Sequence, residues 1–488
     1  MKPRKRRSGL TNKVKGGKDR LANRSMQRDV IRENDPRSRL RDPAELVKFN
    51  GQQVYAAEVK VLLDIAEAVP EEIVSELSTC EPFEYDEDGE PKGYIGVPYQ
   101  LYLFHAVEGH VTALYFIDYE MPALSKCIGE LRWLSYLYLC GNEFETLPET
   151  IGDLQSLKLL DLNNNRLRGL PESIGNLRSL RILDLSYNQL RQLPASIGDL
   201  QSLQKLKLTS NRLQQLPESI GRLKTLQTLG VSCNKLQYFP ESIGHLRALQ
   251  YLGASANQLT QLPESIGNLT TLQILDVSRN RLRQLPDTIG NLAALQELDV
   301  SKNQLQQLPG TIGNLASLKE LNLDNNQLST LPETIGDLKS LQRLHADGNQ
   351  LTALPETIGS LANLRLLSLS KNRLRNLPST LGNLRALESL SISRNQLQTL
   401  PETIGSLSTL QRLYAAENQI TALPATLGGL RALEDLDLKR NRLETLPQSL
   451  LRLPKLRLIL LNGNPLRRID QTLLDSLQSK GVTITGIT

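Results

Sequence analysis

The stretch NQLQQLPGTIGNLASLKELNLDN, Asn303 to Asn325, decides how this chain folds, because NQLSTLPETIGDLKSLQRLHADG follows it at once with the same pattern. Each stretch has 23 residues and begins with asparagine. A fixed period of this length predicts stacked repeats, in which each unit buries its apolar face against its neighbours. The asparagine recurs every 23 residues without an insertion or deletion, at Asn142, Asn165, Asn188, Asn211, Asn234, Asn257, Asn280, Asn303, Asn326, Asn349, Asn372, Asn395, Asn418, Asn441 and Asn464.

The residues before each asparagine follow the pattern LxxLxL, which alternates as a short strand does. Alternation points Leu298 and Val300 toward the core. The residues between and after them, Glu297, Asp299 and Ser301, are then predicted to face outward. One strand per repeat gives a parallel sheet. Because the asparagine can both donate and accept hydrogen bonds, we predict a structural ladder in which each one satisfies backbone groups of its own coil and of the next.

The residues after the turn predict how each coil returns to the sheet. Leu308 and Ile312 pack inward again, Pro309 fixes the backbone, and Gly313 allows a tight return. This outer segment has room for only a turn of helix. Since neighbouring strands are about 4.8 Å apart and the outer segments are bulkier, the stack is expected to bend into a horseshoe with its strands on the inside.

The complete pattern, LPxxIGxLxxLxxLxLxxNxL, resembles that of the leucine-rich repeat family over about Val111 to Asn464. Within the family it is similar to the plant intracellular Ras-group-related proteins, the animal Ras-pathway scaffold, and bacterial and archaeal arrays. The resemblance implies an α/β solenoid, a leucine-rich repeat horseshoe with a parallel concave sheet. It also implies a non-catalytic scaffold that binds a protein partner on the concave face in intracellular signalling.

The rest of the chain does not repeat, and we divide it by composition. Residues 1–43 are predicted to be a basic disordered tail, and 44–110 a small α+β module that caps the array. Within the module we expect one helix broken near Pro70, or two short helices, over 56–78, then an acidic turn over 84–93 and two strands within 93–116. The array covers 111–464 in about 16 coils, of which the first is atypical, with Tyr119 in place of Asn and Ser125 in place of Pro. Residues 465–488 are predicted to cap the other end through Leu473, Leu474, Leu477, Val482 and Ile484.

Charge is unevenly distributed along the chain, whose formal net charge is +5. Residues 1–42 hold 15 Lys or Arg and 5 Asp or Glu, so the tail is basic and the remainder is acidic. The four cysteines are irregularly spaced, as expected of reduced thiols rather than of disulfide caps. No apolar run is long enough to span a bilayer. We therefore expect a monomeric cytoplasmic protein.

Motifs for catalysis are missing from the sequence. It has no GxxxxGK[ST] phosphate loop, no HExxH, no GxSxG and no kinase signature. The four histidines are scattered and none has the spacing of a zinc site. We predict that the chain is not an enzyme and needs no cofactor and no metal.

Two groups of outward-facing strand residues are candidate partner sites. The first, here called the acidic wall, consists of Asp276, Glu297, Asp299, Glu320, Asp324 and Asp347, with His345 beside it and Arg343 as the main opposing charge. The second is a shallow notch over Gly230 and Gly253, with Lys205, Lys207, Tyr251 and Asp276 as its walls. Glycine is a poor strand residue, so two in register suggest a close approach by a partner. The alternatives are that the acidic residues only solubilise the sheet and that the glycines reflect drift in a tolerant repeat.

Arginines also follow the asparagine turns, at Arg166, Arg168, Arg191, Arg212, Arg281, Arg283, Arg373 and Arg375. This edge suits an acidic partner or nucleic acid. Because few aromatic residues interleave with the arginines, we expect a protein partner rather than nucleic acid. Two other functions stay open: a bacterial effector acting in a host cell, and a nucleic-acid-associated adaptor that uses the basic tail.

Overall fold

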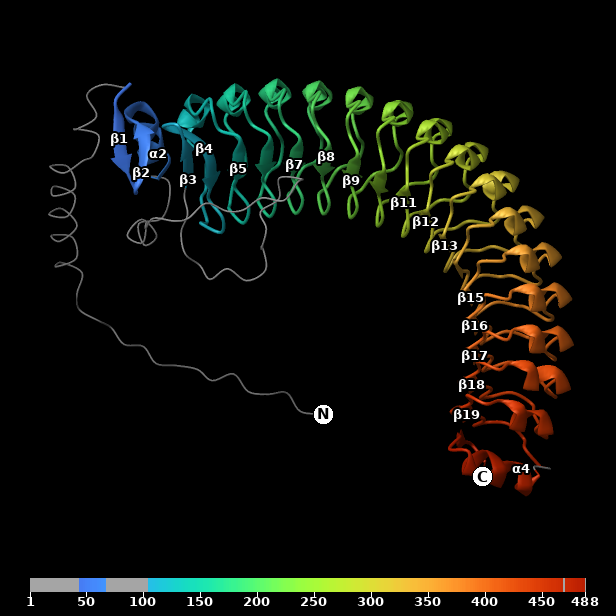
Figure 1. Ribbon diagram of the computed structural model, residues 1–488. Coiled ribbons are helices and arrows are strands. Elements are labelled where there is room, and N and C mark those ends of the chain that lie inside the picture. The colour runs from blue at the N-terminus through green and yellow to red at the C-terminus, as the bar shows by residue number, and fades with distance from the viewer. Residues whose placement is uncertain (1–43, 67–103, 468–469, 488) are drawn as a thin grey trace, which may run out of the picture.

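The computed structural model describes residues 44–66, 104–467 and 470–487, which form one continuous arc with strands inside and short helices outside (Figure 1). The horseshoe predicted from the repeat is confirmed. The tail of residues 1–43, the acidic turn predicted over 84–93 and the start of the strand predicted from residue 93 lie outside the described residues.

The N-terminal elements are β1 (Leu46–Phe49), β2 (Gln52–Tyr55), α2 (Ala56–Ala66) and β3 (Phe104–Val107). The hairpin of β1 and β2 was missed by the sequence analysis. Its two-residue loop, Asn50 and Gly51, has positive φ angles of 44° and 82°. Asn-Gly between two apolar runs is the strongest short-range hairpin signal, so the sequence did contain the information. The helix predicted within 56–78 is present as α2 over its described part.

The concave sheet comprises β3 and the strands β4 (His110–Tyr115), β5 (Tyr136–Tyr138), β6 (Leu159–Asp161), β7 (Ile182–Asp184), β8 (Lys205–Lys207), β9 (Thr228–Gly230), β10 (Tyr251–Gly253), β11 (Ile274–Asp276), β12 (Glu297–Asp299), β13 (Glu320–Asn322), β14 (Arg343–His345), β15 (Leu366–Ser368), β16 (Ser389–Ser391), β17 (Arg412–Tyr414), β18 (Asp435–Asp437), β19 (Leu458–Leu460) and β20 (Thr483–Thr485). Within this sheet, β3 and β4 are the only described strands that pair antiparallel. From β4 to β20 each strand pairs with the next in parallel, so that Leu275, Leu298 and Leu321 lie in register. The first and last coils lie at opposite ends of the arc, so the sheet is open (Figure 1).

The core lies between the sheet and the outer turns. Leu298, Val300, Leu308 and Ile312 are all buried, as the repeat pattern predicts. The prediction that Ser301 faces outward is wrong, because Ser301 is only 7% exposed. The strand ends at Asp299, so the alternation of faces ends there too, and the Ser301 N–H donates to Asp299 Oδ1 at 2.8 Å.

The asparagines tie neighbouring coils together. Asn303 Nδ2 donates to the Val277 carbonyl of the preceding coil at 3.0 Å and to the Val300 carbonyl of its own coil at 3.0 Å. Its Oδ1 accepts from Leu282 N of the preceding coil at 2.9 Å. The same bonds recur along the array, and all fifteen asparagines are buried except Asn464 in the last coil, which is half-buried. Each asparagine therefore replaces backbone partners that the turn cannot supply.

The outer side carries single-turn 3₁₀ helices: η2 (Lys126–Glu130), η3 (Glu149–Asp153), η4 (Glu172–Asn176), η5 (Ala195–Asp199), η6 (Glu218–Arg222), η7 (Glu241–His245), η8 (Glu264–Asn268), η9 (Asp287–Asn291), η10 (Gly310–Asn314), η11 (Glu333–Asp337), η12 (Glu356–Ser360), η13 (Ser379–Asn383), η14 (Glu402–Ser406), η15 (Ala425–Gly429) and η16 (Gln448–Arg452). These turns match the single turn of helix expected there. They stack so closely that a side-chain carbon on Gly313 would lie 2.5 Å from the Thr334 carbonyl oxygen of the next coil.

A hydroxyl in each outer turn from η3 to η16 distinguishes two kinds of coil. Where the residue is threonine, the hydroxyl bonds the preceding coil, as Thr288 Oγ1 does by donating to the Glu264 carbonyl at 2.7 Å. Where it is serine, as at Ser242, the buried Oγ has no hydrogen-bond partner among the described residues. The two side chains lie equally close to the preceding coil, since their Cβ atoms are each 2.7 Å from the carbon that a substituted Gly267 or Gly221 would carry.

We therefore predict that Ser242→Thr raises the free energy of unfolding by about 1 kcal/mol, because the threonine rotamer gains a hydrogen bond to the Glu218 carbonyl. Urea denaturation of the purified protein measures this change. The reverse substitution, Thr288→Ser, is the matched control and should lower stability by a similar amount. An unchanged midpoint for Ser242→Thr would show that the threonine hydroxyl does not gain this hydrogen bond.

Both ends of the array are covered by residues that depart from the repeat. At the N-terminal end, Glu58 of α2 accepts from Val111 N at 2.5 Å and lies 2.8 Å from His110 Nδ1. The His110 ring lies 4.6 Å from that of Tyr55 and 4.7 Å from that of Trp133. At the C-terminal end, helix α4 (Gln471–Ser479) and β20 follow the last coil, with Leu473, Leu474, Leu477 and Val482 buried and Ile484 partly buried against the core.

The atypical first coil keeps the ladder geometry without its own asparagine. Tyr119 occupies that position and is buried, and burial raises the pKa of its hydroxyl to about 12. Its backbone N–H donates to Asn142 Oδ1 at 3.2 Å. Ser125, in place of proline, caps η2 by accepting from Cys127 N at 3.3 Å. The second coil's asparagine therefore serves both coils.

Candidate functional site

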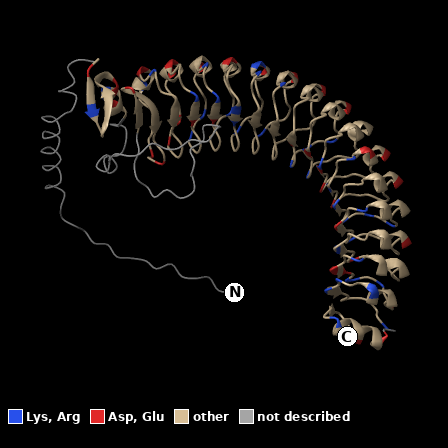
Figure 2. Ribbon diagram, in the orientation of Figure 1, with Lys and Arg blue, Asp and Glu red and all other residues tan. Residues whose placement is uncertain are grey.

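The acidic wall lies on the concave face where the arc bends (Figure 2). Parallel pairing places Asp276 of β11 beside Asp299 of β12, and Glu297 of β12 beside Glu320 of β13. The backbones of these acidic residues in neighbouring coils are therefore separated by about one strand spacing, roughly 4.8 Å. Like charges this close favour a bound cation or a basic partner.

Hydrogen bonds orient Asp276 and Asp299, the aspartates of the acidic wall that lie within strands. Asp276 Oδ1 accepts from Ser278 N at 3.0 Å, and Asp299 Oδ1 accepts from Ser301 N at 2.8 Å. Asp299 Oδ2 also accepts from Asn322 Nδ2 at 3.1 Å. A carboxylate that receives such bonds is oriented before any partner arrives, so that less side-chain entropy is lost on binding.

Asp324 and Asp347 lie just beyond their strands and bond the next coil. Asp324 Oδ1 accepts from Asp347 N at 2.7 Å, and Asp347 Oδ1 accepts from Ser370 N at 2.6 Å and from Ser368 Oγ at 2.7 Å. These two carboxylates therefore have a structural role as well as a place in the wall. Burial is the main cause of a raised pKa at Asp324; the bond from Asp347 N and the charge of His345 oppose it, and the charges of Asp347 and Asp299 reinforce it.

The raised pKa gives a testable pH dependence. The folded state holds its proton on Asp324 to higher pH than the unfolded chain does, so this group makes the protein less stable as pH rises through the window between the ordinary and the folded pKa. We expect Asp324→Asn to stabilise the protein at about pH 7, by less than about 1 kcal/mol because solvent screens the group. Asparagine keeps an acceptor for Asp347 N.

Urea midpoints of wild type and Asp324→Asn across pH measure this effect. The advantage of the variant should shrink toward about pH 4, as Asp324 takes up its proton in both states. A constant difference at all pH values would show that charge is not its cause.

The two glutamates of the acidic wall, which begin strands β12 and β13, differ in their surroundings. Glu320 is bonded by Arg343 of β14, whose Nε donates to Glu320 Oε2 at 2.7 Å and whose Nη2 contacts the same oxygen. Glu297 is exposed. His345 lies in register between Asn322 and Ser368, two strands beyond Asp299. Among the described residues, no group of three His, Cys, Asp or Glu side chains is placed to hold a metal ion.

The notch predicted over Gly230 and Gly253 is only half present. A side-chain carbon on Gly253 would lie 2.6 Å from Tyr251 Oη, because the two residues share one face of β10 and the Tyr251 ring covers the glycine. Above Gly230, a carbon would meet only Thr209 Oγ1, at 3.6 Å, so this half is open. Burial, and then the charge of Asp276, raise the pKa of the Tyr251 hydroxyl.

The lysines predicted as notch walls lie apart from the acidic wall. Lys205 and Lys207 are on β8, three strands from Asp276, or about 14 Å at roughly 4.8 Å per strand. Lys207 Nζ lies 3.4 Å from Asp184 Oδ2 of the preceding strand. The structure therefore groups the aspartates and glutamates, but not the lysines, into one surface.

An apolar cluster at the N-terminal end of the concave face was missed by the sequence analysis. Tyr115 and Tyr138 stack with ring centroids 5.1 Å apart and an angle of 8° between planes. They pack with Ala113, Leu159 and Ile182. The signal was present, since these residues occupy outward strand positions that hold polar residues in most coils.

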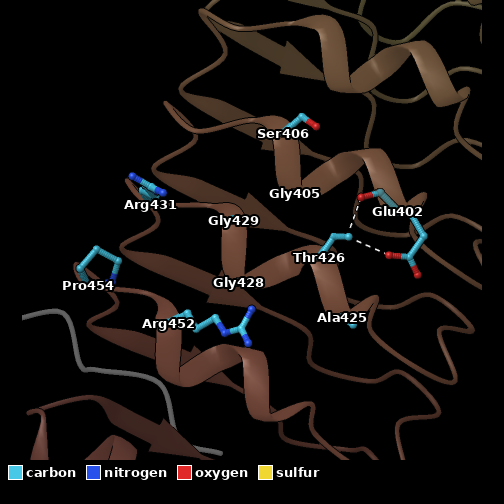
Figure 3. Close-up of a pocket in the computed structure, with 10 residues that line it drawn as sticks. All are labelled: Glu402, Gly405, Ser406, Ala425, Thr426, Gly428, Gly429, Arg431, Arg452 and Pro454. Carbon is cyan, nitrogen blue, oxygen red and sulfur yellow. Dashed lines mark hydrogen bonds between the residues drawn. The ribbon is translucent and has the colours of Figure 1, made fainter.

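A hollow on the outer side of the arc, between η14 and η16, has a volume of about 680 Å³ (Figure 3). It exists because Gly428 and Gly429 carry no side chain, and a carbon on Gly429 would lie 2.3 Å from the Gly405 carbonyl oxygen. Arg431 and Arg452 project at one side, while Glu402 is bonded by Thr426 Oγ1 at 2.9 Å (Figure 3). Close stacking of the coils requires glycine at these positions, and the missing side chains leave the hollow. No ligand is needed to explain it.

Comparisons with known proteins agree with this geometry. The model of the leucine-rich repeat region matches residues 118–211, 172–250, 205–277, 232–327 and 356–480, and a second leucine-rich repeat model matches 306–351. No curated protein matches the sequence. No helix of the described residues is long and apolar enough to cross a membrane.

Solved structures with the same fold come from several kinds of organism. A leucine-rich repeat protein of Leptospira interrogans is 36% identical with a TM-score of 0.68, over 76% of this chain and 94% of that one. The plant peptide hormone receptor RGFR1, in complex with RGF2, is 30% identical with a TM-score of 0.59, over 73% of this chain and 63% of that one. Toll of Drosophila, in complex with Spätzle, is 25% identical with a TM-score of 0.61, over 71% of this chain and 49% of that one.

Proposed function

The chain belongs to the leucine-rich repeat family, and we propose that it is a non-catalytic scaffold that binds a basic segment of a protein partner on its acidic wall. The observation that carries the proposal is that Asp276, Asp299 and Asp324 lie in neighbouring coils with carboxylates already oriented by backbone N–H donors. Lysine and arginine side chains of a partner would replace the solvent around these charges.

Relatives of this fold support a binding role. The two receptors similar to this chain were solved with protein or peptide ligands. We further propose that the scaffold works in signalling in the cytoplasm. Support for the compartment comes from Cys127 and Cys233, which are free thiols in the described structure and suit a reducing environment.

We predict that Asp299→Lys weakens binding of the partner by about 10-fold or more, because it places a like charge against a basic segment. The partner is isolated with the wild-type protein from its native cells, purified, and titrated against each variant. Wild-type binding should also weaken as salt rises through the physiological range.

The matched control is Asp437→Lys, which changes the same position of a strand six coils away. Asp437 Oδ1 accepts from Lys439 N at 3.1 Å, in the same way as Asp299 accepts from Ser301 N. The control alters net charge equally and should leave affinity unchanged. Equal losses for both variants, or none for Asp299→Lys, would rule out the acidic wall as the binding site.

A further inference from the structure

One edge of the array, formed by six residues around each ladder asparagine, is free of acidic residues over eleven coils, although Asp324 and Asp347 immediately precede two of these segments. Each turn comprises the residue before the ladder asparagine, the asparagine and the next four residues, from 164–169 to 394–399. We call these eleven turns the basic edge. They contain no Asp or Glu, and thirteen Lys or Arg: Arg166, Arg168, Arg191, Arg212, Lys235, Arg279, Arg281, Arg283, Lys302, Lys371, Arg373, Arg375 and Arg394.

Backbone hydrogen bonds align these turns into a continuous row. Arg281 N donates to the Leu259 carbonyl of the preceding coil at 2.8 Å, and Gln304 N donates to the Leu282 carbonyl at 2.9 Å. Side chains at equal positions therefore lie side by side along the edge. Arg281, Arg283, Arg373 and Arg375 are all exposed.

The same Arg-Leu-Arg motif occurs three times on the basic edge, in two electrostatic settings. In the first occurrence the charges are neutralised, since Arg166 pairs with Glu143, and Arg168 Nη2 lies 2.9 Å from Glu145 Oε1. In the other two, the preceding coil offers Gln258 and Thr260, or Gln350 and Thr352, at the equivalent positions.

Consequently Arg281, Arg283, Arg373 and Arg375 make no ion pair within the part of the chain that the structure describes. Four guanidinium groups in one row, with no acidic residue in the turns between them, form a surface for a polyanion.

We propose that the basic edge binds the phosphate backbone of a single-stranded nucleic acid. The row follows the bend of the arc (Figure 1). A duplex, with a persistence length of about 50 nm, is too stiff to follow it, whereas a single strand can. A flat lipid surface would also meet the acidic residues that flank the row, such as Glu417 and Glu444.

Two further features favour nucleic acid over an acidic protein segment. Tyr187 and Tyr238, 57% and 46% exposed, both lie in turns of the basic edge. Exposed tyrosine rings provide stacking surfaces for bases, which an acidic peptide would not use. Glutamine amides between the arginines, such as Gln304 and Gln306, can donate and accept, as contacts to sugars and bases require. Although few aromatic residues interleave with the arginines, these two tyrosines give the edge exposed rings on which bases can stack.

The test compares R281Q/R283Q with R166Q/R168Q in the full-length protein. Both variants remove two positive charges from the same motif, but only the first removes unpaired ones. Glutamine occupies the same positions at Gln304 and Gln306, so both variants should fold, which melting curves verify. The basic tail is identical in both proteins, so its contribution cancels.

Fluorescence anisotropy with labelled oligothymidine of about 30 nucleotides measures binding over a range of salt concentrations. We expect R281Q/R283Q to bind about 10-fold more weakly and to reduce the slope of log affinity against log salt by about 1.4, or about 0.7 for each lost phosphate contact. The variant R166Q/R168Q should behave as wild type. This pattern supports the proposal.

Three results would overturn it. Equal losses for the two variants would show only a diffuse effect of net charge. Labelled polyglutamate that binds as tightly and is lost equally in R281Q/R283Q would identify an acidic protein segment as the ligand. A DNA duplex of the same length bound as tightly as the single strand would refute the argument from curvature.

Discussion

Asn303→Ala should lower the free energy of unfolding by at least about 1–3 kcal/mol, the cost of leaving buried polar groups without partners. The substitution removes the acceptor for Leu282 N and the donor to the carbonyls of Val277 and Val300. Because these groups belong to two coils, the loss affects an interface as well as a turn, and stability in a repeat array depends on such interfaces.

Urea denaturation of the purified protein measures this loss. The control is Gln304→Ala, which changes the neighbouring residue, whose side chain is half-exposed. That variant should unfold as wild type does. If Asn303→Ala also left the midpoint unchanged, water would have to satisfy the turn, and the ladder would have no structural role.

Gly313→Ala should be destabilising by about 1–3 kcal/mol or more, the usual cost of forcing an extra carbon into a closely packed site. The added carbon would lie 2.5 Å from the Thr334 carbonyl oxygen and 2.8 Å from Thr334 Cβ. Backbone atoms cannot move away as the end of a flexible side chain can, so two outer turns would have to separate.

The same coil contains a matched control, Gly310. A carbon added there has nothing within 4 Å. Gly310→Ala should therefore be neutral or stabilising by about 0.4–1 kcal/mol, because alanine restricts the unfolded chain. Comparing the melting temperatures of the two variants separates the close approach from the general effect of replacing glycine. Equal effects at both positions would show that the close approach of Gly313 to the next coil is not the cause.

Residues of the repeat were predictable because each coil meets the same environment. Alternation in LxxLxL placed Leu298 and Val300 in the core, and the spacing of apolar residues after the turn placed Leu308 and Ile312 there. The prediction that Ser301 faces outward was wrong because alternation describes a strand, and this strand ends two residues earlier. The hairpin of β1 and β2 was missed although Asn50 and Gly51 predict it.

The acidic wall was predictable as a set of outward residues, but its geometry was not. Outward position follows from period alone, whereas the bonds from Asp347 N to Asp324 and from Asn322 to Asp299 join coils that are 23 residues apart. The covering of Gly253 by Tyr251 depends on a side-chain rotamer, which no repeat pattern specifies.

The sequence by itself determined the period, the parallel sheet, the single outer turn and the asparagine positions, because these follow from local spacing and from residue types that only one arrangement satisfies. The tertiary structure decided which charges are neutralised, because it brings residues 23 positions apart within reach of each other. Arg166 and Arg281 occupy the same position of the same motif, yet only Arg166 finds a glutamate in the preceding coil. Pairing depends on what the neighbouring coil presents at a few ångströms, and stacking, rather than the repeat unit, fixes that distance.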